Sequence, residues 1–336
     1  MTSTEAHDAG PADQDTGLIG SEPHTRGLDV GSQHQPPRNL LDGMFKALRP
    51  KQWVKNVLVV AAPLAAGVEA FTVTTFRDIV IAFAVFCMAA SSIYLVNDAR
   101  DVEADREHPV KRFRPIAAGV LPVGVAYGMA LVLIAGAVGV SLLATSGTNL
   151  AVVVSVYIVL QLGYCFGWKH QPVIDIALVS SGFMLRAMAG GVAASIALSQ
   201  WFLLVAAFGS LFMAGGKRYA EYLLAQETGA KIRKSLQGYT PTYLRFVWQM
   251  AATAVIIFYA LWGFQMAQAA DGDGAVWYQI SMVPFTVAIM RYASDIDRGE
   301  GGAPDEVALR DRPLQTLAVL WILCIVLAVY LAPGTL

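Results

Sequence analysis

The chain has 336 residues, of which 56% are hydrophobic and 15% are charged, and its formal net charge is −1. A soluble domain carries about 25% charged residues, so this composition excludes an ordinary soluble protein. Several stretches reach the roughly 20 apolar residues that a bilayer crossing needs, and the sequence therefore predicts an all-α, polytopic membrane protein. The near-zero net charge says little about partners, and we expect a membrane and a lipid rather than nucleic acid. The three cysteines lie in apolar stretches, without metal or disulfide spacing, and are expected as small core residues: Cys87, Cys165 and Cys324.

The first 39 residues differ from the rest of the chain. They are rich in Gly, Pro, Asp, Ser and Thr and hold almost no bulky apolar residues, so they cannot bury enough surface to fold. We predict a disordered tail over residues 1–39, without the layout of a signal peptide, and a transmembrane catalytic domain over residues 40–336. After the tail, Leu41, Phe45 and Leu48 share one side of a helix, which predicts a short helix lying on the membrane surface.

Nine membrane-spanning helices follow in the prediction, at about 54–71, 76–97, 122–144, 149–167, 173–194, 200–216, 244–269, 276–291 and 314–332. The Lys and Arg residues of the loops fall on one set of alternate loops, and the other set holds only Arg77. The positive-inside rule then places the N-terminus and the charged loops in the cytoplasm and the C-terminus outside. We therefore expect a plasma-membrane protein with its chemistry at the cytoplasmic face, whereas a transporter would show polar groups near the midplane.

An acidic stretch begins where the second predicted span ends. Asp98, Asp101 and Asp105 are three and four residues apart, which places their carboxylates on one face of a helix, with Asn97 at the same end. Three like charges on one stripe need a cation, either as a solvated network with nearby Lys and Arg residues or as a divalent metal. We favour the metal, because Mg²⁺ takes oxygen ligands from one or two carboxylates and from substrate phosphates. The predicted metal ligands are Asn97, Asp98, Asp101 and Asp105, and the three aspartates are the predicted catalytic residues.

Cations near this stretch are candidate phosphate ligands. Lys51 and Lys55, before the first span, are four residues apart and share a helix face. They are either a phosphate clamp or cations that snorkel to the membrane surface. Arg114 suits a phosphate because its guanidinium is a planar fork. Arg112 and Lys169 complete the substrate-binding candidates on these loops.

The fifth predicted span holds two charged residues. Asp175 lies near its cytoplasmic end, and Arg186 lies three turns deeper on nearly the same face. An intramembrane charge is a functional hypothesis by default, so both are substrate-binding candidates. The alternative for Arg186 is a structural pair with a carbonyl or carboxylate of a neighbouring helix. On the span before, Tyr157 and Tyr164 either line the same cavity or only satisfy packing and one hydrogen bond.

A basic segment follows the sixth predicted span. Lys217 and Glu221 are four residues apart, and Arg218 and Glu221 are three apart, which describes an ion-pair ladder on a helix. The same three residues are substrate-binding candidates, because two cations beside the acidic stretch would complement a doubly phosphorylated ligand. For the later basic run 231–234 we favour attraction to anionic lipid.

These residues carry a family resemblance. The pattern Asn97-Asp98-x-x-Asp101-x-x-x-Asp105, followed by Arg114-Pro115, resembles the first Asp-rich motif of the UbiA-type intramembrane prenyltransferase superfamily. The superfamily usually has a second Asp-rich loop after helix six, where this chain holds a basic segment with one carboxylate. In this basic segment, and in the segments 49–56 and 297–306, the chain resembles one branch of the superfamily. That branch transfers 5-phosphoribose to decaprenyl phosphate for cell-wall arabinan precursors.

The resemblance implies a nine-helix UbiA-type bundle with cytoplasmic catalytic loops. It implies 5-phosphoribosyl 1-diphosphate and decaprenyl phosphate as substrates, decaprenylphosphoryl-5-phosphoribose as product, and Mg²⁺ as cofactor. Under this interpretation Lys217 and Arg218 hold the ribose 5-phosphate, with Lys55 as a further candidate. Two rivals stay open: a polyprenyltransferase with an aromatic acceptor, which would need the second Asp-rich loop, and a transporter of anionic lipids.

Two features of the sequence leave their role open. The small residues over 136–139 can pack either within one chain or between the chains of a homo-oligomer. The Gly-rich loop 299–306 either covers the site or only links two spans. We expect the prenyl tail of the lipid to enter laterally between helices, because it cannot cross water cheaply.

Overall fold

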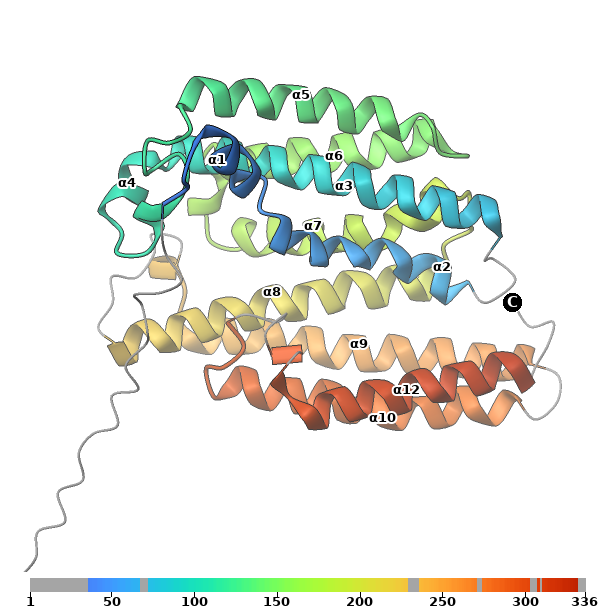
Figure 1. Ribbon diagram of the computed structural model, residues 1–336. Helices are drawn as coiled ribbons and strands as arrows, with labels where there is room; N and C mark the ends of the chain where they lie inside the picture. Colours follow the sequence, from blue (N-terminus) through green and yellow to red (C-terminus); the bar gives the residue numbers. More distant parts are fainter. Residues whose placement is uncertain are drawn as a thin grey trace, which may run out of the picture. The chain divides into compact units, whose positions relative to one another are not determined.

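All secondary structure in the described part of the chain is helical, as the sequence predicts (Figure 1). The computed structural model describes residues 36–66, 72–228, 236–270, 274–302, 307–308 and 310–331. Most of the predicted tail, residues 1–35, lies outside this range, so its disorder stays a prediction. The basic run 231–234 and the end of the Gly-rich loop, 303–306, also lie outside the described residues.

The described chain begins with a short amphipathic helix, α1 (Leu40–Ala47). The Asn39 side chain accepts a hydrogen bond from the Asp42 amide at 2.9 Å, and this N-cap fixes where the helix starts. Leu41 is 75% exposed and Phe45 is 60% exposed, while the other side of the helix packs on α3. An apolar face turned outward is what a helix lying on a membrane requires.

The first predicted span is not a regular α-helix. Pro50–Val60 forms a 3₁₀ helix, η1, and Ala61–Ala65 continues it as α2. A 3₁₀ helix of this length is uncommon. It has three residues per turn, so side chains three residues apart lie on the same face, and side chains four residues apart do not. Lys51 and Lys55 therefore diverge by about 120° around the helix. The prediction that they share a face is wrong, because it assumed α-helical geometry.

Two glycines of α7 (Ile174–Ala193) allow this irregular segment to lie against the bundle. A Cβ atom on Gly190 would overlap the carbonyl oxygen of Val59 in η1. A Cβ atom on Gly191 would lie 2.8 Å from the Ala62 Cβ in α2. The backbones therefore touch directly, which is how small residues promote helix packing in membranes.

The remaining long helices each overlap one predicted span. They are α3 (Val73–Arg100), α5 (Val123–Ser141), α6 (Gly147–Cys165), α7, α8 (Gln200–Thr228), α9 (Pro241–Ala269), α10 (Gly274–Asp297) and α12 (Arg312–Leu331). Both α8 and α10 continue beyond their predicted spans. Short helices lie between them: α4 (Val102–Glu107), η3 (Lys111–Phe113), η4 (Trp168–His170) and η5 (Leu236–Gly238).

Within the described residues, six helices are both long enough and apolar enough to cross a membrane. They are Val73–Arg100, Val123–Ser141, Gly147–Cys165, Ile174–Ala193, Pro241–Ala269 and Arg312–Val329. This is the architecture of a multi-pass membrane protein. The prediction of nine spans is not confirmed by this count and stays a prediction.

The helices pack largely in chain order around two larger cores. The first core is built on α3, which contacts α5, α6 and α7 and buries Phe86 and Leu95. The second core lies among α8, α9 and α10 and includes Tyr219, Trp248 and Ile296. Helix α7 packs on both α6 and α8 and so joins the two halves, and α12 packs on α10.

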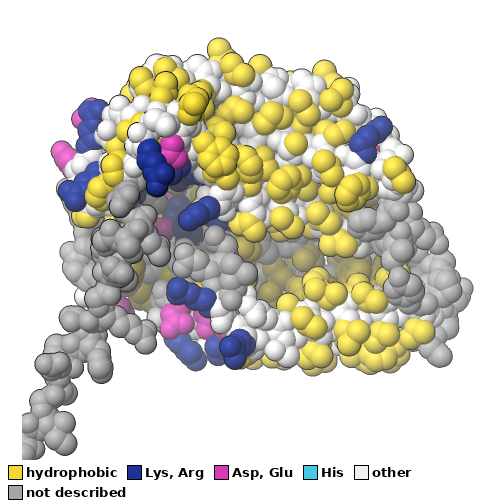
Figure 2. Space-filling model, in the orientation of Figure 1, with side chains coloured by type: hydrophobic (Ala, Val, Ile, Leu, Met, Phe, Trp, Pro, Cys, Tyr) yellow, Lys and Arg dark blue, Asp and Glu magenta, His cyan; other side chains and the backbone are white. Residues whose placement is uncertain are grey.

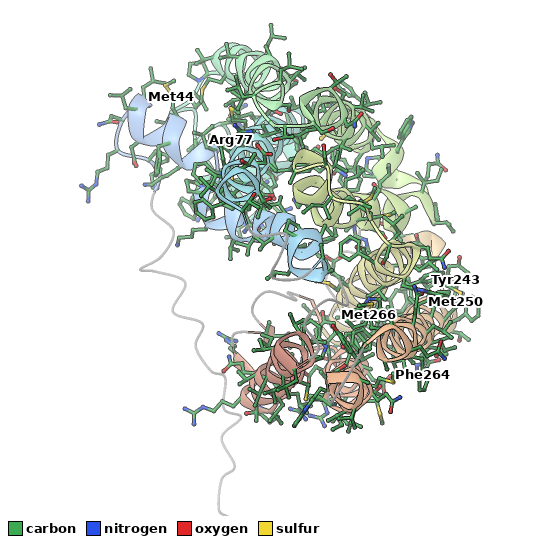
Figure 3. All side chains as sticks on the ribbon, turned by 90° about the vertical axis from the view of Figure 1, so that its right-hand side faces the viewer. Met44, Arg77, Tyr243, Met250, Phe264 and Met266 are labelled. Carbon is green, nitrogen blue, oxygen red and sulfur yellow. The ribbon has the colours of Figure 1, made fainter. Side chains whose placement is uncertain are left out.

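Charged side chains gather at one end of the helices, which we call the charged end. Figure 2 shows Lys, Arg, Asp and Glu concentrated beside α1 and α4, while apolar side chains cover the length of the helices. Leu131 of α5 is 68% exposed and Val319 of α12 is 64% exposed, as expected of helices that face lipid. Figure 3, viewed from the opposite end, shows Arg77 near the start of α3 and Met250 and Phe264 on the outer side of α9.

Candidate active site

The charged end holds two groups of acidic and basic side chains. The first, the acidic cluster, consists of Arg49, Asn97, Asp98, Asp101, Asp105, Arg114 and Lys169. The second, the buried cluster, consists of Tyr164, Asp175, Lys217, Arg218, Glu221 and Tyr239. Most of the site residues predicted from the sequence fall in one of these two groups.

Two carboxylates of the acidic cluster converge on one guanidinium group. Arg114 Nη1 lies 2.6 Å from Asp105 Oδ2 and 3.1 Å from Asp98 Oδ1. Arg49 Nη2 donates to both oxygens of Asp98, at 2.7 Å each. Asp98 and Asp105 are each only 3% exposed. Removing one member of such a buried charge group costs about 3–5 kcal/mol, because its partners are left uncompensated.

The backbone explains how these two carboxylates meet. Helix α3 ends at Arg100 and α4 begins at Val102, yet helical hydrogen bonds continue across the junction. The Asp101 amide donates to the Asn97 carbonyl at 2.9 Å, and the Asp105 amide donates to the Asp101 carbonyl at 2.8 Å. Two turns of helix therefore separate Asp98 from Asp105 and place them on the same face.

Asp101 belongs to a separate pair. Lys169 Nζ lies 2.8 and 2.7 Å from its two carboxylate oxygens and 3.4 Å from Asn97 Oδ1. Lys169 comes from η4, at the end of α6, and its side chain is 10% exposed. The sequence predicts three carboxylates on one stripe, but they do not share one cation here, because Lys169 binds Asp101 while Arg114 binds Asp98 and Asp105.

Asp98 and Asp105 also decide whether the site fits a divalent metal. The described residues include no group of three or more His, Cys, Asp or Glu side chains placed to hold a metal ion. These two carboxylates nevertheless each direct an oxygen at a single position, which Arg114 fills. One or two carboxylates are the usual protein ligands of Mg²⁺ when substrate phosphates complete the coordination. The donor set therefore fits such an ion if the guanidinium group moves to the substrate.

The buried cluster is centred on Asp175. This residue is fully buried in the first turn of α7, where the helix N-terminus favours a negative charge. Its Oδ2 accepts a hydrogen bond from Arg218 Nε at 2.8 Å, and its Oδ1 accepts one from the Tyr239 hydroxyl at 2.5 Å. Arg218, which is 3% exposed, also donates to Glu221 Oε2 at 2.8 Å and to the Tyr164 hydroxyl at 3.4 Å. Residues of α6, α7 and α8 thus meet at one guanidinium group, and Tyr239 joins them through Asp175.

The surroundings of Arg218 and Tyr239 shift the pKa of both side chains. Burial by itself would lower the pKa of Arg218, but Glu221, Tyr164 and Asp175 outweigh burial and raise that pKa. Burial, followed by the hydrogen bond to Asp175, raises the pKa of Tyr239. At neutral pH the guanidinium group therefore keeps its charge and the phenol keeps its proton. A charged, planar fork in fixed orientation is suited to bind a phosphate.

The other predicted cations lie at the edges of the two clusters. Lys217 Nζ lies 3.9 Å from Glu221 Oε1. Lys51 is exposed, and Lys55 is half-buried in η1. Arg112 is exposed, and its guanidinium lies 4.9 Å from the centroid of a neighbouring aromatic ring. Substrate binding by these residues stays a prediction.

Arg186 lies apart from both clusters. Its Nε donates to Asn56 Oδ1 at 2.7 Å, its Nη1 to the Gly182 carbonyl at 2.7 Å, and its Nη2 to the Tyr157 hydroxyl at 2.8 Å. These contacts tie η1 to α6 and α7 at a residue that is 8% exposed. They favour the structural interpretation of Arg186 and of Tyr157, and Asp175 does not take part in them.

The sequence prediction omits two members of the clusters. Arg49 stands in the basic segment before the first span, and its left-handed backbone, with φ of 54°, directs the chain into η1. The sequence feature that could have drawn attention to Arg49 is its position directly before Pro50. Tyr239 lies 64 residues from Asp175 in the chain, and no local pattern points to it.

The clusters are consistent with a known family of membrane enzymes. The sequence profile of the UbiA prenyltransferase family matches residues 57–322, a range that contains every member of both clusters except Arg49. The chain belongs to this family. The resemblance drawn from the Asp-rich stretch is therefore confirmed.

Relatives with curated names are similar over nearly their whole length. Decaprenyl-phosphate phosphoribosyltransferase of Corynebacterium glutamicum is 73% identical over 317 residues, which cover 94% of this chain and 95% of the relative. The protein of the same name from Mycolicibacterium smegmatis is 59% identical and covers 88% of this chain and 95% of the relative. These identities place the chain within one branch of the UbiA family.

A solved structure confirms the fold. A UbiA homolog from Archaeoglobus fulgidus, bound to GPP and Mg²⁺, matches with a TM-score of 0.63 and covers 86% of this chain and 99% of that chain. The sequence identity is 15%, so this likeness concerns the fold alone. The predicted UbiA-type helical bundle is confirmed.

Proposed function

We propose that this chain transfers 5-phosphoribose from 5-phosphoribosyl 1-diphosphate to decaprenyl phosphate and releases diphosphate. The observation that carries the proposal is the 73% identity to decaprenyl-phosphate phosphoribosyltransferase of Corynebacterium glutamicum, over 95% of that protein. The site supports it, since two separate clusters that each contain Lys and Arg side chains, at one end of an apolar bundle, suit a donor with two phosphorylated ends and a lipid acceptor. The product, decaprenylphosphoryl-5-phosphoribose, would serve the synthesis of cell-wall arabinan precursors.

The reaction is a displacement at C1 of the ribose. A phosphate oxygen of the lipid forms a bond to C1, the bond from C1 to the diphosphate oxygen breaks, and its electron pair leaves with the diphosphate. The lipid phosphate is already anionic at neutral pH, so the reaction needs no strong general base. Attack from the face opposite the leaving group inverts the configuration at C1.

In this proposal the acidic cluster receives the diphosphate. Asp98 and Asp105 would hold Mg²⁺, which when bound neutralises charge on the departing diphosphate. Arg49 and Arg114 would turn from these carboxylates to the diphosphate oxygens, where charge-assisted hydrogen bonds are strongest. Lys169, oriented by Asp101, would add a third cation.

The buried cluster would bind the other end of the donor. Arg218 and Lys217 supply the positive charge for the ribose 5-phosphate, and Asp175 and Glu221 orient the Arg218 guanidinium group. Lys55 is a further candidate for the same phosphate. This division gives each phosphorylated end of the donor its own set of cations.

We also propose that the charged end faces the cytoplasm and that the protein lies in the plasma membrane. The distribution of Lys and Arg over alternate loops supports this orientation. The prenyl chain would then approach between helices from the bilayer, while the soluble donor would arrive from the cytoplasm.

The experiment that tests this proposal offers the protein two different pairs of donor and acceptor. Purified full-length protein in nanodiscs is given radiolabelled 5-phosphoribosyl 1-diphosphate with decaprenyl phosphate, and in parallel an isoprenyl diphosphate with an aromatic acid. We expect label in the lipid, with one diphosphate released for each phosphoribose transferred. Prenylation of the aromatic acid without phosphoribosyl transfer would overturn the proposal, and so would the absence of both activities.

A further inference from the structure

Two turns meet beside the buried cluster, one before α7 and the other before α9. A Cβ atom on Gly238 would overlap the ring of Pro172, so the two turns touch where a side chain would not fit. The next residue, Tyr239, is 5% exposed, and its ring stacks on Tyr243 with the centroids 5.9 Å apart. The turn before α9 is therefore docked on the turn before α7.

The backbone at this contact has an unusual conformation. Val173 has a φ of 69°, in the left-handed region that β-branched residues rarely adopt. Helix α7 begins at the next residue, so this conformation sets how the helix starts and where Asp175 lies. The Val173 amide donates a hydrogen bond to the Tyr239 hydroxyl. An unfavourable conformation in one segment is thus held by a contact from another, as is typical of functional sites.

The same hydroxyl group reaches into the buried cluster. It donates to Asp175 Oδ1 at 2.5 Å, while Asp175 Oδ2 accepts from Arg218 Nε at 2.8 Å. Without the hydroxyl, the fully buried Asp175 would lose one of these two donors, and the Val173 amide would lose its acceptor. Both losses would loosen the carboxylate that orients Arg218.

We propose that Tyr239 is a positioning residue: it holds the turn at Val173 and the Asp175 carboxylate so that Arg218 meets the 5-phosphate of the donor. This inference rests on the proposed function. Tyr239 acts through Asp175 and not by touching the substrate. Its effect should therefore concern the 5-phosphate alone and spare the diphosphate, which the acidic cluster receives.

The experiment compares two donors on the purified full-length protein in nanodiscs. One donor is 5-phosphoribosyl 1-diphosphate, and the other is ribosyl 1-diphosphate, which lacks the 5-phosphate. We expect Tyr239→Phe to lower kcat/KM about tenfold for the phosphorylated donor, mainly through KM, and less than about twofold for the other donor. Tyr243→Phe, which alters the neighbouring stacked tyrosine, is the matched control and should leave both values unchanged.

Two further variants test the same geometry. Gly238→Ala keeps the hydroxyl but pushes the turn away from Pro172, and it should cause the same selective rise in KM. Val173→Gly removes the unfavourable backbone conformation at this position, because glycine adopts a positive φ readily. In the Tyr239→Phe background it should therefore reverse part of the rise in KM for the phosphorylated donor. If Tyr239→Phe does not fold, Gly238→Ala alone decides the question.

The outcomes separate this inference from the function on which it rests. An equal loss of activity with both donors, accompanied by a lower Tm, would reduce Tyr239 to a structural role and overturn the inference. An unchanged KM in both Tyr239→Phe and Gly238→Ala would also overturn it. Wild-type protein that uses neither donor would instead refute the proposed function.

Discussion

The acidic cluster and the buried cluster both pair carboxylates with arginines, but they differ in how freely those arginines can move. In the acidic cluster, the side chains of Arg49 and Arg114 are each 26% exposed and reach nearly buried carboxylates. In the buried cluster, Arg218 is 3% exposed and is held by three segments of the chain. Under the proposed function, this difference would let the acidic cluster exchange its cations for a metal and a diphosphate, whereas the buried cluster would be organised before the substrate binds.

The largest effect should follow from changing the carboxylate that both arginines of the acidic cluster share. We expect Asp98→Asn to lower transfer by about 10³-fold, because a proposed metal ligand is lost. We also expect a loss of about 3 kcal/mol in the free energy of unfolding, because Arg49 and Arg114 lose a common partner. Transfer assays and denaturant unfolding measure the two effects.

Glu103→Gln is the matched control for this prediction. Glu103 lies in the same acidic stretch, but its side chain is 80% exposed and pairs with Arg106 at 2.9 Å on the surface. We expect its loss to leave activity and stability nearly unchanged. Equal losses in the two variants would mean that the total charge of the stretch matters and not the geometry of Asp98.

The next prediction tests whether the buried cluster is organised before the substrate binds. Arg218→Lys keeps the positive charge but loses the planar fork that contacts both Asp175 and Glu221. We expect the KM for 5-phosphoribosyl 1-diphosphate to rise about tenfold, with a smaller change in kcat. Arg245→Lys, on the surface of α9, serves as control, and a donor KM that stays at the wild-type value in Arg218→Lys would contradict the assignment.

A smaller effect should come from the separate pair within the acidic cluster. Asp101 has a side chain that is 33% exposed and contacts Lys169. We expect Asp101→Asn to destabilise the protein by less than about 1 kcal/mol, because partly exposed pairs contribute little. Its activity should fall less than that of Asp98→Asn. A stability loss as large as that of Asp98→Asn, measured by denaturant unfolding, would show that the two pairs are one unit.

The smallest effect concerns pH. Burial, with Lys111 and Arg114 acting in the same direction, lowers the pKa of His108 from its ordinary value of 6.5. The neutral ring fits the fold, since its Nδ1 accepts hydrogen bonds from the Val110 and Lys111 amides at 3.2 Å each. Its contribution to stability is therefore present above pH 6.5 and is lost as the pH falls through the folded-state pKa.

A comparison of Tm with and without this histidine isolates its effect. We expect the Tm of the wild type to fall slightly more than that of His108→Asn as the pH is lowered from 7 to 5, roughly the range in which histidine titrates. The difference should be small because His108 is exposed. Parallel curves for the two proteins would show that the turn before Arg114 does not depend on this ring.

The same comparison explains how far the sequence leads. The acidic stretch could be predicted because its members stand within one short segment, where helical spacing brings Asp98 and Asp105 together. The buried cluster could be predicted only in pieces. Asp175 is conspicuous as a charge within an apolar span, and Arg218 belongs to the basic segment after the sixth span, but their pairing depends on how α7 and α8 pack. Tyr239 could not be predicted, since a tyrosine before a helix has no distinguishing local pattern.

The first predicted span shows a second limit to what could be predicted from the sequence. Its apolar composition predicts a membrane helix, but the choice between 3₁₀ and α-helical geometry depends on tertiary contacts. Gly190 admits the Val59 carbonyl against α7, and Arg186 of α7 donates a hydrogen bond to Asn56 of η1. A local pattern carries no information about either contact, so the relation between Lys51 and Lys55 was predicted wrongly.

The most direct test of the account is the position of a metal in the complex with donor. Crystals of the protein with Mn²⁺ and 5-phosphoribosyl 1-diphosphate would give an anomalous signal for the metal. We predict a peak bound by Asp98 and Asp105, with the diphosphate beside it and the 5-phosphate at Arg218. A peak away from both aspartates, or a donor bound with its diphosphate at Arg218, would contradict the account.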